Sequence, residues 1–302
     1  MRFAINLPQF NALADPRTLA ELAHEAEGAG WDGFFLWDHM LSVPGIPIAD
    51  PWVTLAAIAM RTERIRIGPL VTPLPRRRPW KVAREAATLD QLSNGRLILG
   101  VGLGWDEWRE YSAFGEPPAD KPHAAMLDEG LDIVTGLWRG EPFSYSGQHY
   151  TVRDAQFLPM PVQSPRIPIW VACLWPNKAP MRRAARWDGV CPIFGGPGHQ
   201  PTPEKVREML AYIQQYRLAD SPSRSEEERL ADSPSRSEED GTSDAPFDMV
   251  LAGYVGNDPA EQAAELLRGY AEAGATWWQE GFWWDDTPDI VRARIRQGPP
   301  KL

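Results

Sequence analysis

Short apolar runs alternate along this chain with amphipathic helical segments, and this alternation constrains the fold more than any other feature. Each run has the continuous apolar character of a strand that is buried on both faces. Strands are predicted at residues 3–7, 34–37, 65–71, 97–101, 167–173, 189–193, 249–252 and 276–279. Strands that alternate with helices pair in parallel, so eight such units predict the α/β class and a (β/α)₈ TIM barrel.

The predicted helices begin with a recurring pair of residues. A capping residue directly precedes proline at Asp15-Pro16, Asp50-Pro51, Asp258-Pro259 and Thr287-Pro288. The cap oxygen accepts a backbone N–H, and proline occupies the first turn, where no N–H is needed. Helical spacing of apolar residues predicts two further helices over 79–92 and 203–216.

The length and composition fit a single barrel domain over 1–302, with 43% hydrophobic residues available for its core. One segment, 217–245, departs from the pattern. It contains "RLADSPSRSEEE" followed at once by "RLADSPSRSEED", a tandem 12-residue repeat. The segment has few apolar residues, and burying them cannot compensate for the conformational entropy that the segment would lose on ordering. We therefore predict a flexible or disordered loop insertion. A lid or docking segment is the functional alternative.

Charge and cysteine content exclude several kinds of partner. The net charge of −10 disfavours nucleic acid and anionic membranes, and no apolar run approaches the roughly 20 residues of a membrane span. The first residues resemble a strand rather than a signal peptide. Two cysteines, Cys173 and Cys191, offer neither a disulfide framework nor a metal-binding spacing. We therefore expect a cytoplasmic protein without a nucleic-acid or membrane partner.

The stretch "LILGVGLGWDEW", residues 97–108, resembles a dinucleotide-binding turn at first sight. A G-x-G-x-x-G turn would need its third glycine at Trp105 or Glu107, so a Rossmann site is rejected. In a barrel, Gly100, Gly102 and Gly104 would stand at the carboxyl end of the fourth strand. There they either let a flat ligand approach the backbone or form a bend at the barrel rim. Spacing alone leaves both interpretations open.

The ends of the other strands supply candidate chemistry. His39 follows the second strand, where a barrel enzyme would place an acid or base. Tryptophans at strand ends could wall an apolar pocket: Trp37, Trp105, Trp175 and one of Trp277 and Trp278. The run Arg76-Arg77-Arg78 could reach an anionic ligand tail, although such a run is more commonly a solvated loop.

Other enzyme classes find less support. No spacing typical of a metal site and no G-x-S-x-G motif occurs in the sequence. A hydrolase or aldolase would need paired carboxylates or a lysine that forms a Schiff base, and Lys178 is the clearest such lysine at the barrel mouth. This class is therefore ranked low.

Four stretches resemble the bacterial luciferase-like oxidoreductases. They are "GWDGFFLWDHM", the long block from "DPWVTLAAIAM" to "LILGVGLGW", "RWDGVCP" and "GATWWQEG". The resemblance covers nearly the whole chain except 217–245. It implies a TIM barrel that binds FMN or the deazaflavin F420 at the carboxyl ends of its strands.

The resemblance also implies roles for individual residues. Asp38 and His39 match the pair that faces the reactive part of the cofactor. Leu70, Val71 and Thr72 match the segment behind the ring, with a non-proline cis peptide expected between Leu70 and Val71. Asn177, Lys178 and helix N–H groups are left to hold the phosphate, because the glycine pair usual in the family is missing there. The candidate cofactor contacts are Trp37, Leu70, Val71, Thr72, Gly100, Gly102, Gly104, Trp105, Cys173, Asn177, Lys178 and Trp277.

Three functions remain open at this point. The sequence favours an F420-dependent oxidoreductase that transfers hydride to or from a small organic substrate, with His39 moving the proton and Asp38 tuning it. A monooxygenase that uses reduced FMN and O₂ is the alternative, and a non-catalytic flavin-binding protein is the third. Dimers are common among related proteins, but no sequence feature here demonstrates a homodimer interface.

Overall fold

A computed structural model describes residues 1–194, 201–219 and 246–302. Its parallel sheet has the strand order β3-β2-β1-β11-β10-β9-β8-β5-β4. The strands are β1 (Arg2–Leu7), β2 (Gly33–Leu36), β3 (Arg66–Pro69), β4 (Thr72–Pro73), β5 (Leu99–Gly102), β8 (Ile169–Trp175), β9 (Gly189–Phe194), β10 (Asp248–Gly253) and β11 (Trp277–Gly281). From residue 220 onward, the predicted repeat insertion lies outside the described residues.

The sheet closes into a barrel between its two ends. Ile67 of β3 forms a parallel bridge with Leu97, and the Ile98 N–H donates to the Ile67 carbonyl at 2.9 Å. β3 lies within the strand predicted at 65–71, and β4 continues it beyond Val71. Counted as one strand, the two give the ring the eight strands of a TIM barrel. Every predicted strand begins and ends within two residues of its observed bounds. The predicted fold class is confirmed.

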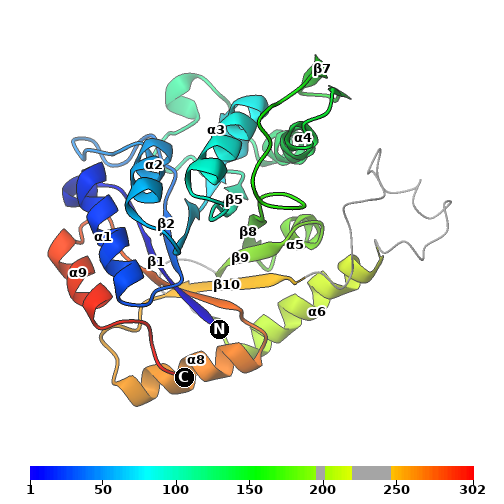
Figure 1. Cartoon of the computed structure of the whole chain (residues 1–302). Coiled ribbons are helices and arrows are strands. Elements are labelled where there is room, and N and C mark those ends of the chain that lie inside the picture. Colours follow the sequence, from blue (N-terminus) through cyan, green and yellow to red (C-terminus); the bar gives the residue numbers. More distant parts are fainter. Residues whose placement is uncertain (195–200, 220–245) are drawn as a thin grey trace.

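Helices surround the barrel (Figure 1). They are α1 (Pro16–Gly28), α2 (Pro51–Arg61), α3 (Pro79–Leu92), α4 (Asp120–Trp138), α5 (Lys178–Ala185), α6 (Pro203–Ala219), α8 (Ala260–Glu272) and α9 (Pro288–Arg296). An antiparallel hairpin, β6 (Phe143–Ser146) and β7 (Thr151–Ala155), stands apart from the barrel sheet. The hairpin, α4 and α5 were not predicted. Of the helices in the described ranges, none has the length and apolar character needed to cross a bilayer.

Three of the four predicted helix caps are confirmed. Asp15, Asp50 and Thr287 each accept a backbone N–H in the first turn of their helix. The prediction for Asp258 is wrong. The α8 helix begins one residue later than that cap requires, with Pro259 in the N-cap position and no side-chain cap. The Asp258 backbone N–H instead closes a turn onto the carbonyl of Val255.

The barrel interior is filled in layers of side chains. One closed layer has members that are all at most 3% exposed: Ala4, Phe35, Ile98, Trp170, Val250 and Trp277. Because side chains alternate along a strand, the residues two positions further on form the next inward-facing layer. We call it the mouth layer: Asn6, Trp37, Gly100, Ala172, Ala252 and Gln279, together with Cys191 of β9, the register partner of Ala172. Ala252 is exposed and Trp37, Ala172 and Cys191 are partly exposed, so the barrel opens at this end.

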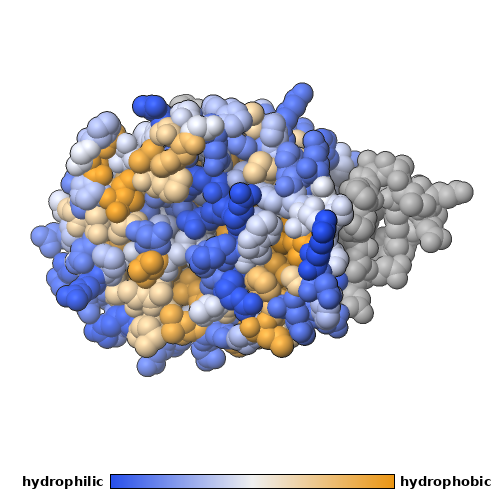
Figure 2. All heavy atoms as spheres, turned by 90° about the horizontal axis from the view of Figure 1, so that it is seen from above, coloured by the Kyte–Doolittle hydropathy of each residue, from blue (hydrophilic) through white to orange (hydrophobic). Residues whose placement is uncertain are grey.

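The face of the molecule that Figure 2 shows has a mixture of residue types. Figure 2 shows the face seen from above, where apolar groups are scattered among hydrophilic residues. Single exposed apolar side chains are normal on protein surfaces and need no binding partner to explain them. We therefore look for function at the barrel mouth.

The glycines of β5 let it pack closely against the junction of β3 and β4. A Cβ added at Gly100 would lie 2.5 Å from the Pro69 carbonyl oxygen and 2.6 Å from Leu70 Cδ1. At Gly102, an added Cβ would lie 2.9 Å from Val71 Cγ2. The neighbouring strand thus takes up the space that these glycines leave.

Gly100→Ala is therefore expected to destabilise the fold by about 1–3 kcal/mol, because the new methyl group must displace backbone. Urea denaturation measures this loss. The matched control is Gly28→Ala at the end of α1, where an added Cβ meets nothing within 4 Å. Equal stability of the two variants would contradict the close packing.

Candidate active site

His39 lies just beyond β2, at the open end of the barrel. Its side chain is 26% exposed, and its Nδ1 lies 2.8 Å from Oε2 of Glu110. Phe10, Trp37 and Trp108 surround the imidazole, with ring centroids 5.7, 5.9 and 4.8 Å away. The imidazole is therefore held by one carboxylate and enclosed by aromatic rings, yet it remains accessible.

Glu110 is a buried anchor for this histidine. Its Oε1 accepts the backbone N–H groups of Met40 and Leu41 and lies 2.8 Å from Nη1 of Arg76. Burial raises the pKa of Glu110, but the hydrogen bond and charge of His39, the charge of Arg76 and the Met40 N–H together hold it below its usual value. An ionised Glu110 accepts a hydrogen bond from Nδ1–H, which leaves the lone pair on Nε2 of a neutral His39. Nε2 has no hydrogen-bond partner among the described residues.

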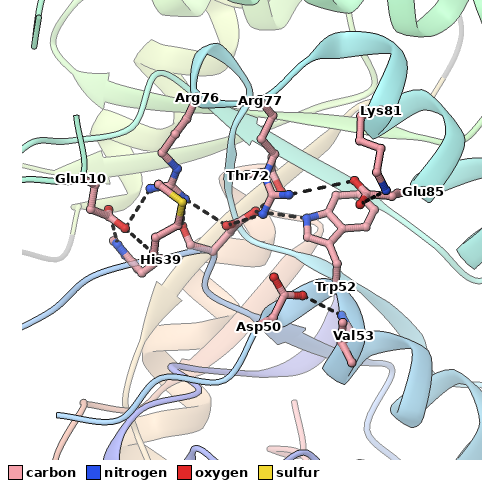
Figure 3. A network of polar contacts seen from close by, with 12 residues as sticks. His39, Asp50, Trp52, Val53, Thr72, Arg76, Arg77, Lys81, Glu85 and Glu110 are labelled. Atoms are coloured by element: carbon pink, nitrogen blue, oxygen red, sulfur yellow. Dashed lines mark hydrogen bonds and ion pairs between the residues drawn. The ribbon is translucent and has the colours of Figure 1, made fainter. Parts of the chain in front are cut away.

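Asp38 lies beside His39 in the chain, but its carboxylate contacts a separate set of donors. Figure 3 labels them: Thr72, Trp52, Arg76 and Arg77. Asp38 Oδ2 accepts from Thr72 Oγ1 at 2.7 Å and from Trp52 Nε1 at 3.2 Å. Arg76 Nη2 lies 3.0 Å from its Oδ1, and Arg77 Nη2 lies 3.0 Å from both carboxylate oxygens. Asp38 thus ties the end of β2 to β4 and to the loop that follows it.

Arg76 connects the two carboxylates, and this corrects the sequence analysis. The arginine run was expected to be a solvated loop, but the Arg76 side chain is buried between Asp38 and Glu110. The carboxylate in contact with His39 is that of Glu110, and the Asp38 carboxylate is linked to Glu110 through Arg76. Glu110 was missed because three acids follow the glycines of β5, and spacing does not distinguish which one turns inward.

The sequence matches the family model for luciferase-like monooxygenases over residues 1–200. The chain belongs to the luciferase-like monooxygenase family. An F420-dependent glucose-6-phosphate dehydrogenase of Amycolatopsis mediterranei is 36% identical over 161 residues, which cover 52% of this chain and 47% of that protein. The matches span about half the length of such curated relatives.

Two solved structures share the barrel fold along nearly the whole chain. An F420-dependent tetrahydromethanopterin reductase from Methanopyrus kandleri has a TM-score of 0.72 at 17% identity, with 98% of each chain covered. An F420-dependent secondary alcohol dehydrogenase, in complex with an F420–acetone adduct, has a TM-score of 0.73 at 15% identity, covering 99% of this chain and 98% of that one. At such identities the likeness shows the TIM-barrel fold alone.

The structure of this luciferase-like protein brings several predicted residues together at the mouth. The peptide between Leu70 and Val71 is cis, as the resemblance implied, and both side chains are partly exposed beside β5. Thr72 is buried against Asp38. Gly104 is exposed with a φ of 79°, and Trp105 is 71% exposed without a packed position in the pocket wall.

Four other predicted residues lie away from this group. Cys173 faces the outer core beneath the helices, where burial raises its thiol pKa to about 12, and Trp277 lies in the closed layer below the mouth. Asn177 and Lys178 are exposed at the start of α5, with Lys178 Nζ over the rings of Trp175 and Tyr212. Their roles in cofactor binding stay predictions.

The open end of the barrel has exposed apolar side chains and buried polar atoms. Leu174 and Ile193 continue the inward faces of β8 and β9 and are each 50% exposed, an apolar surface that a ring could cover. Buried amide atoms of Asn6, Gln9 and Gln279 have no partner. Within the described ranges, no cluster of His, Cys, Asp or Glu could hold a metal ion.

The depressed pKa of Glu110 makes stability depend on pH. A carboxyl whose folded pKa is lowered contributes stability above its unfolded pKa, and this contribution is lost as pH falls through the folded value. We expect Glu110→Gln to have a shallower loss of stability below about pH 4.5 than wild type. Urea denaturation at a series of pH values measures the slope, with the exposed Glu107→Gln as a control for loss of one charge. Equal slopes of unfolding free energy against pH in Glu110→Gln and wild type would contradict the lowered pKa of Glu110.

Proposed function

We propose that this protein is an F420-dependent oxidoreductase that transfers hydride between the deazaflavin and a small organic substrate, with His39 as the acid or base. One observation carries the proposal: a partly exposed imidazole is fixed through Nδ1 by the buried carboxyl group of Glu110 at an open barrel mouth. Membership of the family and the F420-dependent relatives support it.

The residues that would hold F420 line one side of the mouth. Leu70 and Val71 would lie behind the ring, with Gly102 next to them and Leu174 and Ile193 offering apolar surface. Asn177 and Lys178 would lie toward the phosphate. When bound, F420 supplies the hydride acceptor or donor for the reaction.

His39 supplies the proton chemistry that hydride transfer to or from an oxygen-bearing substrate requires. Its Nε2 can take the proton of a substrate hydroxyl, or return one to a carbonyl oxygen. The negative charge of Glu110 stabilises the imidazolium that forms, and its hydrogen bond keeps the proton on Nδ1. Phe10, Trp37 and Trp108 exclude water from one side of the ring, which strengthens both interactions.

A titration with F420 and FMN side by side tests the proposal. We expect F420 to bind at least tenfold more tightly, a difference of about 1.4 kcal/mol. Loss of F420 absorbance is then followed with glucose 6-phosphate and a panel of secondary alcohols. Preference for FMN, with O₂ uptake by the reduced complex, would support the monooxygenase alternative. F420 binding without turnover of any substrate would favour a binding protein.

The cytoplasmic location and the homodimer stay predictions of the sequence. Sedimentation of the purified protein measures its oligomeric state directly. A single species at the mass of one chain, 33.9 kDa, would contradict the dimer.

A further inference from the structure

Two carboxamides meet inside the barrel on the side formed by β1 and β11. Asn6 Nδ2 donates to Gln279 Oε1 at 2.9 Å, and the two residues are only 9% and 1% exposed. β1 and β11 are neighbouring strands in the ring. Both side chains belong to the mouth layer, directly above the closed layer that contains Ala4 and Trp277.

This amide pair has unused hydrogen-bonding capacity. Asn6 Oδ1 and Gln279 Nε2 are buried and have no partner. If both amides are turned over, the bond between them survives, and the pair still has one free carbonyl oxygen and one free NH₂ group. Each buried unpartnered polar group costs about 1–3 kcal/mol, so the pair is poorly explained as packing alone.

The surroundings of the pair are uncharged. The described residues of the mouth layer carry amide, indole, methyl or hydrogen side chains, apart from Cys191, whose thiol pKa is raised well above its usual value by burial. A buried charge placed here would therefore have no opposite charge beside it, which is costly. Ala252, the register partner of Gln279 on β10, is exposed, so the pair lies next to the open side of the mouth.

The position of the pair separates it from the proposed cofactor side. Around the ring, β3, β4 and β5 carry the cis peptide and the glycines, whereas β1 and β11 lie on the opposite side of β2. His39 follows β2 and stands between these two sides. A substrate bound over β1 and β11 would thus meet His39 and the cofactor ring together.

We propose that Asn6 and Gln279 form the substrate subsite, and that it binds an uncharged group that both donates and accepts hydrogen bonds, such as a carboxamide or a hydroxyl group. The inference rests on the proposed function, because it places the substrate beside the cofactor. A phosphate or carboxylate end of a substrate would have to point away from this pair, toward solvent.

Benzamide and benzoate test the subsite, since they share a shape but differ in charge and in the ability to donate a hydrogen bond. Binding of each probe to the cofactor-free protein is measured by ligand-observed NMR. We expect benzamide to bind at least tenfold more tightly than benzoate. The near-isosteric double variant Asn6→Leu/Gln279→Met is expected to lose about tenfold in benzamide affinity, the effect of one or two hydrogen bonds.

The stability of the double variant in urea distinguishes a substrate subsite from a structural role of the amide pair. Removing both amides together leaves no new unpartnered atom, so the double variant should be as stable as wild type or more stable in urea. The control is Gln163→Met. The Gln163 carboxamide hydrogen-bonds to Arg66, Asp90 and the Leu97 carbonyl, so this variant should lose stability without losing benzamide affinity.

Two results would overturn the subsite: equal benzamide affinity in wild type and the double variant, or benzoate binding as tightly as benzamide. Neither measurement involves F420. A protein that failed to bind F420 but kept the amide-dependent preference for benzamide would refute the proposed function and leave this inference standing. F420-linked turnover without a preference for benzamide would support the proposed function and refute the subsite.

Discussion

Replacing His39 with alanine is expected to lower the turnover of an F420-linked substrate by about 10²–10⁴-fold while F420 affinity stays unchanged. The imidazole is the partly exposed titratable group that Glu110 holds at the mouth, and its removal takes away the proton carrier without touching the apolar surface around Leu174 and Ile193. Steady-state absorbance of F420 measures turnover, and a fluorescence titration measures binding.

The matched control is His24→Ala, which removes an exposed imidazole from α1. It should leave both turnover and binding at the wild-type level. If His39→Ala retained full turnover, the acid–base role would be refuted. If it lost F420 binding in proportion to turnover, His39 would be a binding residue instead.

Asp38→Asn is expected to destabilise the protein by about 3–5 kcal/mol, the usual effect of breaking a buried ion pair from one side. The substitution keeps the shape of the side chain but removes the charge that faces the guanidinium groups of Arg76 and Arg77. It also places an NH₂ group among donors. The single amide oxygen cannot accept both from Thr72 and Trp52 and from the two guanidinium groups. Urea denaturation measures the loss of unfolding free energy.

Asp50→Ala provides the comparison from the same region (Figure 3). Asp50 is exposed, and its Oδ1 caps α2 by accepting the Val53 N–H at 2.8 Å, so its loss should cost only about 1 kcal/mol. A double variant that combines Asp38→Asn with Arg77→Leu should lose less than the sum of the two single variants, because the two residues are in contact. The ion pairs would contribute little to stability if the losses of unfolding free energy were additive. The same would follow if Asp38→Asn cost no more unfolding free energy than Asp50→Ala.

The barrel itself was predictable because its determinants are local. Continuous apolar runs mark strands buried on both faces, and the Asp-Pro pair marks helix starts wherever the aspartate directly precedes the first turn, as at Asp15 and Asp50. Asp258 failed because the backbone turn from Val255 moves the start of α8 by one residue. α4 escaped prediction because Ala119 stands in its N-cap position and makes no side-chain cap.

By itself, the sequence determined the alternation of strands and helices, the closed parallel barrel that this implies, and the strand end where His39 lies. Only the tertiary structure decided which carboxylate meets His39, because Glu110 reaches it from a loop 71 residues away in the chain. The tertiary structure likewise decided that Cys173 faces the helices and that Asn6 contacts Gln279, which lies 273 residues away in the chain. Periodicity records which residues are buried, whereas the partner of a buried polar group depends on strand register and loop path, which are set by the closure of the whole ring.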